Sequence, residues 1–185
     1  MKMAADNLGE KRILVLGIGN ILMKDEGVGC RVVEELQRHY EFPDNVSVVD
    51  SGTMGMVLLD LMRRHDFTLV VDGVDNTGYP PGTVVRMSPE DIASNQIMHS
   101  LHDVRFVDVL EAAKLIGLEI EGHVVGVQVE DIAPVDLVIG LSDSVEEALE
   151  TAIDAVLTVL AEQGIFPTPL ASESGASGQT STPNR

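Results

Sequence analysis

Short apolar runs alternate with helix-like periodicities along this chain, and this alternation constrains the fold more than any other feature. The apolar runs are rich in Val, Ile and Leu with little polar alternation, which is typical of strands covered by helices on both faces. We therefore predict an α/β domain of three layers, with a mostly parallel, twisted sheet of about five strands and helices on both of its faces. The predicted strands lie near residues 12–17, 46–50, 67–72, 83–87 and 122–128, and the predicted helices near residues 26–40, 54–64, 103–116 and 144–163.

The last predicted helix has the most regular pattern. Apolar residues recur at spacings of three and four between Val145 and Leu160, which predicts one buried helical face. Ser144 and Glu147 have the spacing of a capping box at the helix start. Gly164 stands where glycine commonly ends a helix.

The length of 185 residues suits a single domain. We assign residues 11–165 to that domain and residues 1–10 to a flexible N-terminal extension. Residues 166–185 are rich in Ser, Gly, Thr and Pro, so we expect them to form a disordered tail.

Charge and cysteine content narrow the class of protein. The formal net charge of -18 argues against nucleic acid as a partner, because binding to phosphate needs clustered Lys and Arg. After Lys114 the sole cation is Arg185, an asymmetry that is typical of a solvated surface and is also compatible with a basic partner peptide. Cys30 is the single cysteine, so no internal disulfide can form. The chain has neither a long apolar run nor an N-terminal apolar stretch, so we expect a cytoplasmic protein without a membrane span.

Acidic residues occupy the glycine-containing turn after the first predicted strand, where many α/β proteins bind phosphate. This turn contains Asp25 and Glu26, while Asp72 ends the third predicted strand and His102 precedes a predicted helix. Ligands bind outside the carboxyl ends of parallel strands, so the fold can bring Glu26, Asp72 and His102 into one crevice. Two carboxylates and an imidazole indicate a metal site with open coordination positions. From the residues alone, Asp25 competes with Glu26, and His99 competes with His102.

Each candidate ligand also has an ordinary structural explanation, because acids at helix starts and strand ends commonly act as caps. Other chemistries fit less well. A dinucleotide-binding motif would need a third glycine, and the acids in the turn would repel an anionic cofactor. The chain has no P-loop, no Gly-x-Ser-x-Gly elbow and no HExxH motif.

Five segments, in order over residues from about 10 to 165, resemble the nickel-iron hydrogenase maturation proteases. The segments read LVLGIGNILMKDEGVG, VVDSGTMGMVLLDLM, LVVDGVD, PPGTV and SLHDVRFVDVL. Carried over by motif, the resemblance places the family's metal ligands on Glu26, Asp72 and His102. It thereby selects His102 over His99. It also implies that residues 11–165 form a maturation protease domain.

The resemblance implies an endopeptidase that removes the C-terminal extension of the hydrogenase large-subunit precursor after nickel insertion. In the implied scheme nickel arrives in the precursor, and the protease recognises it through the three ligands. The turn from Asp50 to Thr53 resembles a turn beside the family's cleft, with Ser51 in place of a glycine. A side chain at position 51 raises the question whether this turn keeps the backbone conformation of the family, since glycine readily adopts a positive φ. As a hypothesis, Asp50 or Asp25 supplies a carboxylate that orients water or substrate.

Two other functions stay open at this stage. One is a non-hydrolytic chaperone that handles nickel or the precursor, and the other is a Rossmann-like nucleotide-binding domain. Nothing in the sequence requires more than a monomer.

Overall fold

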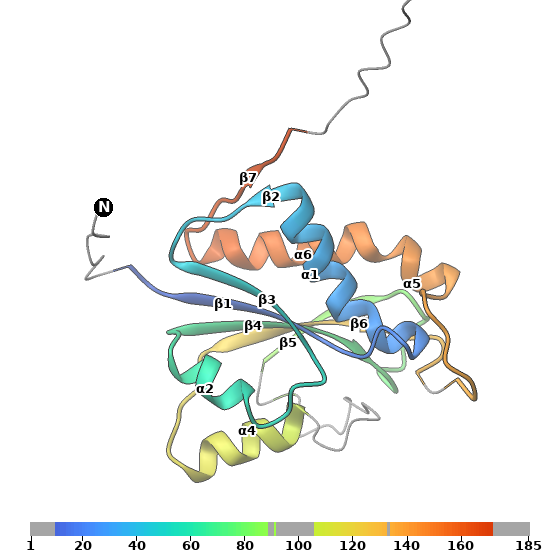
Figure 1. The fold of residues 1–185 in the computed structure, drawn as a ribbon, viewed down its shortest axis with the longest axis horizontal. Helices are drawn as coiled ribbons and strands as arrows, with labels where there is room; N and C mark the ends of the chain where they lie inside the picture. Colours follow the sequence, from blue (N-terminus) through green and yellow to red (C-terminus); the bar gives the residue numbers. More distant parts are fainter. Residues whose placement is uncertain (1–9, 89–90, 92–105, 133, 172–185) are drawn as a thin grey trace, which may run out of the picture.

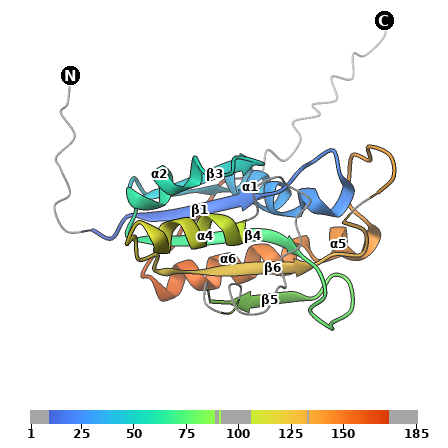
Figure 2. The same ribbon diagram turned by 90° about the horizontal axis from the view of Figure 1, so that it is seen from below.

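The computed structural model of the protein describes residues 10–88, 91, 106–132 and 134–171. The main strands are β1 (Ile13–Ile18), β3 (Val46–Gly52), β4 (Phe67–Val74), β5 (Val84–Met87) and β6 (Gly122–Gln128). They form one five-stranded sheet in the order β3-β1-β4-β6-β5 (Figure 2). β5 runs antiparallel to β6, and the other neighbouring pairs are parallel. The predicted α/β class and the mostly parallel sheet are confirmed.

Helices cover both faces of this sheet. α1 (Val28–His39) and α6 (Leu149–Glu162) lie on one face, and α2 (Leu58–Arg63) and α4 (Phe106–Leu115) lie on the other (Figure 1). Ile13 and Val15 of β1 pack with α1 and α6, whereas Leu14 and Leu16 pack with α2 and α4. All four side chains are fully buried, and each such burial contributes about 1.5–3 kcal/mol. A strand that is apolar on both faces therefore needs a helical layer on each side. No helix of the described residues is long and apolar enough to cross a membrane.

The helices differ from the sequence pattern in three places. The helix predicted from residue 54 begins only at Leu58. The predicted helix start near residue 26 is a short 3-10 turn, η1 (Lys24–Gly27), and α1 begins only at Val28. The predicted helix over 144–163 is two helices, α5 (Asp143–Glu147) and α6, with a break at Ala148. The capping-box prediction is wrong, because Ser142 is the N-cap residue and makes no capping bond with its side chain. The Ser144 hydroxyl instead donates to Glu130 Oε2 at 2.8 Å, so a distant partner replaces the local one.

The described chain continues past the predicted domain boundary at residue 165. Two short strands, β2 (Tyr40–Glu41) and β7 (Thr168–Pro169), pair antiparallel beside the main sheet. The backbone N–H of Leu170 then donates to the carbonyl of His39 at 2.8 Å. Residues 1–9 and 172–185, which hold most of the predicted extension and tail, lie outside the described residues.

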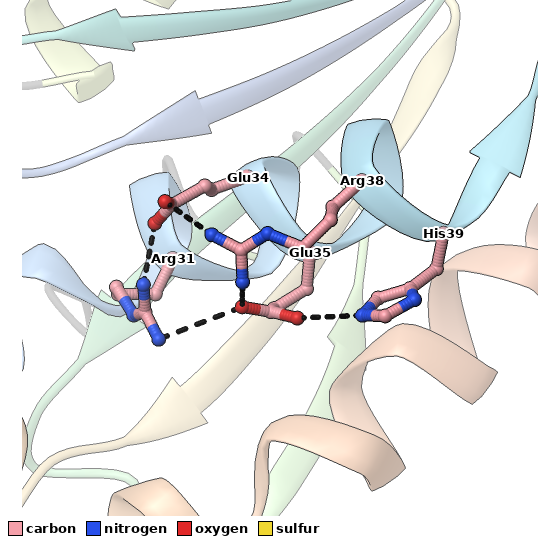
Figure 3. Close-up of polar contacts among 5 residues, drawn as sticks. All are labelled: Arg31, Glu34, Glu35, Arg38 and His39. Atoms are coloured by element: carbon pink, nitrogen blue, oxygen red, sulfur yellow. Dashed lines mark hydrogen bonds and ion pairs between the residues drawn. The ribbon is translucent and has the colours of Figure 1, made fainter. Parts of the chain in front are cut away.

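A network of ion pairs runs along α1 (Figure 3). Arg38 contacts Glu34 at 2.8 Å and Glu35 at 2.6 Å, and Glu35 also contacts His39 at 3.1 Å and Arg31 at 3.5 Å. Pairs at these helical spacings each stabilise a helix by about 0.2–0.5 kcal/mol. They reinforce the helix that follows the acidic turn.

Candidate metal site at the carboxyl end of the sheet

Close backbone contacts bring the acidic turn to the carboxyl ends of β1 and β4. A Cβ atom on Gly29 would lie 2.2 Å from the carbonyl oxygen of Val71 and 2.3 Å from that of Ile18. Such distances are sterically forbidden, so only glycine lets α1 approach the two strands this closely. A Cβ on Gly73 would likewise lie 3.3 Å from the carbonyl oxygen of Asp25, so η1 sits directly against the end of β4. Glu26 on η1 and Asp72 on β4 are thereby brought together.

Glu26 and Asp72 form a pair of buried carboxylates, each with only 1% of its surface exposed. The backbone N–H of Gly73 donates to Asp72 Oδ1 at 2.8 Å, while Asp72 Oδ2 has no hydrogen-bond partner among the residues that the structure describes. Burial raises the pKa of Asp72 well above its usual value, and the negative charge of Glu26 raises it further. Two neighbouring buried carboxylates need a proton or a cation between them to offset desolvation and repulsion. The donor set therefore fits a bound cation.

The third predicted ligand lies outside the described residues. This applies both to His102 and to its competitor His99. Within the part of the chain that the structure describes, no three His, Cys, Asp or Glu side chains form a group that can hold a metal. The histidine therefore stays a prediction, whereas the pairing of the two carboxylates is visible.

Asp25 points to different neighbours from those of Glu26. Its side chain is fully buried, and its two oxygens accept four hydrogen bonds from residues 130, 131 and 142. These donors lie in the segment that follows β6 and leads into α5. Because they lie more than a hundred residues away, no local pattern in the sequence indicated these contacts.

Asp50 and Cys30 lie at the same end of the sheet. Asp50 is exposed near the end of β3, and its Oδ1 accepts the backbone N–H of Gly52 at 2.9 Å.

The Cys30 thiol is buried and donates to the carbonyl of Gly19 at 3.5 Å. Burial raises the pKa of this thiol, followed by the nearby carboxylate of Asp50 and then that of Asp72. A thiol with a raised pKa stays protonated and is a poor nucleophile.

Ser51 has a structural role in the turn after β3. Its hydroxyl is buried and donates to the carbonyl of Gly17 at 2.8 Å, which joins β3 to β1. The positive φ in this turn, 50°, belongs to Gly52. Serine at position 51 is therefore compatible with the observed backbone, and the conformational question raised by the sequence is answered.

Exposed apolar side chains surround the carboxyl end of the sheet. They belong to the turns after β1 and β3 and to the loop before α5, and include Ile21, Leu22, Met54, Met56, Val57, Val135, Leu137 and Ile139. The loop before α5 is attached to the turn after β1 by an isolated bridge between Met23 and Val138. Apolar surface beside buried polar groups is typical of a binding site for another molecule.

Comparisons with known proteins give a consistent result. A family model described as hydrogenase maturation protease matches residues 30–159. The chain is 38% identical over 162 residues to hydrogenase 2 maturation protease of Escherichia coli (strain K12), covering 85% of this chain and 96% of that protein. It is 37% identical over 158 residues to the hydrogenase expression/formation protein HupD of Thiocapsa roseopersicina, covering 84% of this chain and 71% of that protein. The solved structure of the hydrogenase maturating endopeptidase HybD from E. coli matches with a TM-score of 0.73 at 38% identity, covering 85% of this chain and 97% of that one.

Proposed function

The chain belongs to the hydrogenase maturation protease family, and on this premise we propose that it is a nickel-dependent endopeptidase. Its substrate is the large-subunit precursor of a nickel-iron hydrogenase, from which it removes the C-terminal extension after nickel insertion. The comparisons support the family and its endopeptidase activity. The dependence on nickel and the roles of individual residues are our proposal.

The observation that carries the proposal is the buried pair of Glu26 and Asp72. Asp72 has a carboxylate oxygen without a hydrogen-bond partner in the described part of the chain, and beside a second buried acid this favours a cation at this place. Two carboxylates and the imidazole of His102 suit a borderline divalent ion such as nickel. We propose that these three side chains bind the nickel of the loaded precursor, which makes cleavage conditional on metal insertion.

The chemical step needs a carboxylate that lies near the metal and is accessible to water. The substrate's nickel ion supplies Lewis acidity, either to the scissile carbonyl or to a water molecule. Of the two aspartates proposed to orient water or substrate, Asp50 is exposed, and one of its oxygens is held by a backbone N–H. Both oxygens of Asp25 accept hydrogen bonds already. These contacts favour Asp50 for the role.

The test uses purified protein with nickel-loaded and nickel-free precursor, and mass spectrometry of the large subunit. We expect a C-terminal peptide to be lost only from the loaded precursor. Glu26→Gln, Asp72→Asn and His102→Ala should abolish processing while circular dichroism shows an intact fold. His99→Ala is the matched control and should process normally. Normal processing by Asp50→Asn would withdraw the role of that carboxylate.

Two results would point to other functions. Binding of the precursor without a shortened product would indicate a metal-handling chaperone. Cleavage that is equally fast with and without nickel would contradict nickel recognition and leave an endopeptidase of another type.

We further propose that the protein acts as a monomer in the cytoplasm on a precursor with a basic surface. Its net charge of -18 would then speed the encounter, and added salt would slow it. A processing rate that does not depend on ionic strength would contradict this electrostatic contribution. Sedimentation equilibrium of the purified chain tests the monomer.

A further inference from the structure

We infer that Asp25 is a positioning residue, which fastens the segment between β6 and α5 to η1 and thereby holds Glu26 in place against Asp72. The inference rests on the proposed role of Glu26 and Asp72. It assigns to Asp25 a task different from contact with substrate or water.

The hydrogen bonds of Asp25 form a tether between two distant parts of the chain. Oδ1 accepts the backbone N–H of Ser142 at 2.6 Å. Oδ2 accepts the backbone N–H groups of Glu130 and Asp131 at 3.0 Å each and the hydroxyl of Ser142 at 2.9 Å. Hydrogen bonds to an ionised carboxylate are about twice as strong as neutral ones. The side chain is fully buried, so water does not compete for these oxygens.

The turn that carries Glu26 depends on such contacts because its own hydrogen bonds are few. η1 has four residues, and 3-10 turns have poorer hydrogen-bond geometry than α-helices. Lys24 has a φ of 53°, a conformation that costs energy for any residue other than glycine. Its backbone N–H donates to the carbonyl of Val138 at 2.8 Å, and the N–H of Val138 donates to the carbonyl of Leu22 at 2.9 Å. The segment that Asp25 fastens therefore also holds the strained part of the turn.

An amide at position 25 cannot replace the carboxylate. Asparagine has one acceptor oxygen, and its NH₂ group only donates. In either orientation of the amide, that group would face a backbone N–H and leave this donor without its acceptor. The turn would then lose part of its attachment, and a displacement of about 1 Å at a reacting group can reduce the rate about 100-fold.

Three variants test the inference. Asp25→Asn breaks the tether, and Ser142→Ala removes one of its four hydrogen bonds. Asp136→Asn is the matched control, since it makes the same chemical change at an exposed side chain of the same segment that takes no part in the tether. Asp131 is unsuitable as a control, because its ion pair with Lys24, with an Nζ–Oδ2 distance of 3.3 Å, also joins the segment to η1.

The first readout is steady-state processing of nickel-loaded precursor at a temperature where each variant is folded. For Asp25→Asn we expect kcat to fall about 100-fold with little change in KM. For Ser142→Ala we expect a fall of about fivefold, corresponding to one hydrogen bond. Asp136→Asn should retain the wild-type kcat. If Asp25→Asn does not fold, the graded loss in Ser142→Ala still tests the tether.

The second readout measures the geometry of the metal ligands in the absence of substrate. Co²⁺ added to each protein gives visible absorption bands that report ligand geometry, and Asp25→Asn should shift these bands whereas Asp136→Asn should not. Wild-type kcat and an unchanged Co²⁺ spectrum in Asp25→Asn would overturn the inference. A loss of processing that only matches the loss of folded protein would also overturn it. Normal processing by Glu26→Gln and Asp72→Asn would instead refute the proposed function itself, so the two failures are distinguishable.

Discussion

Gly29→Ala is expected to separate the acidic turn from β4 without unfolding the protein. The new Cβ would lie 2.2 Å from the carbonyl oxygen of Val71 and 2.3 Å from that of Ile18. To reach an ordinary contact of about 3.5 Å, the start of α1 has to move by about 1 Å. Because Glu26 lies three residues before this point, it moves with the helix and away from Asp72.

The cost in stability is moderate because two contributions oppose each other. Overpacking of this kind costs about 1–3 kcal/mol, whereas alanine is favoured over glycine in a helix by about 1 kcal/mol. We expect the free energy of unfolding to fall by about 0–2 kcal/mol, compared with a typical total of about 5–15 kcal/mol. The variant therefore stays folded, while kcat for precursor processing falls about 100-fold through the displaced ligand.

Urea denaturation and precursor processing measure the two effects separately. Gly122→Ala is the matched control, because its Cβ would lie 1.9 Å from the carbonyl oxygen of Thr68 at the opposite end of β4 from Asp72. It should lose comparable stability but process precursor at close to the wild-type rate. Equal losses of processing in both variants, or normal processing by Gly29→Ala, would refute the reasoning.

Three further predictions concern stability. Burial raises the pKa of Asp72 above its unfolded value, and the charge of Glu26 raises it further. The contribution of Asp72 to the free energy of unfolding is therefore fully present below a pH of about 3.9 and is lost as the pH rises through the folded pKa. In metal-free buffer Asp72→Asn should therefore be more stable than wild type at neutral pH and similar to it in acid. Equal denaturation midpoints at neutral pH would contradict this. Ser51→Gly removes the 2.8 Å hydrogen bond to Gly17 and should lower the free energy of unfolding by about 1–2 kcal/mol in urea titrations, and an unchanged value would argue against that bond. Leu36→Ala empties a fully buried position of α1 and should cost about 2–5 kcal/mol, so a loss near zero in calorimetry would contradict the packing of that helix.

Much of the fold was predictable from local patterns. Ile13 and Leu16 belong to a run without polar residues, and such a run requires cover on both sides of the sheet. The break at Ala148 was not predictable in this way, because the apolar spacing continues through it from α5 to α6. The pairing of Tyr40–Glu41 with Thr168–Pro169 also lacks a signal, since each segment is too short to show a period.

The candidate site was likewise predictable from the sequence only in part. Glu26 follows the first predicted strand and Asp72 ends the third, and parallel strands place their carboxyl ends at one edge of a sheet. Asp25 and Glu26 are adjacent and chemically alike, so composition and spacing did not distinguish them. Their neighbours do: Asp25 accepts hydrogen bonds from the segment before α5, and Glu26 lies beside Asp72.

The sequence by itself determined the strands of the main sheet, the approximate positions of its helices and the edge of the sheet where its acids gather, because hydrophobic period and strand direction are local properties of the chain. Only the tertiary structure decided which acid is attached to the segment before α5 and which one faces the second carboxylate. Asp25 accepts hydrogen bonds from residues that lie 105 to 117 positions later in the sequence. Tertiary packing brings these residues together, and the sequence around Asp25 gives no indication of the contacts.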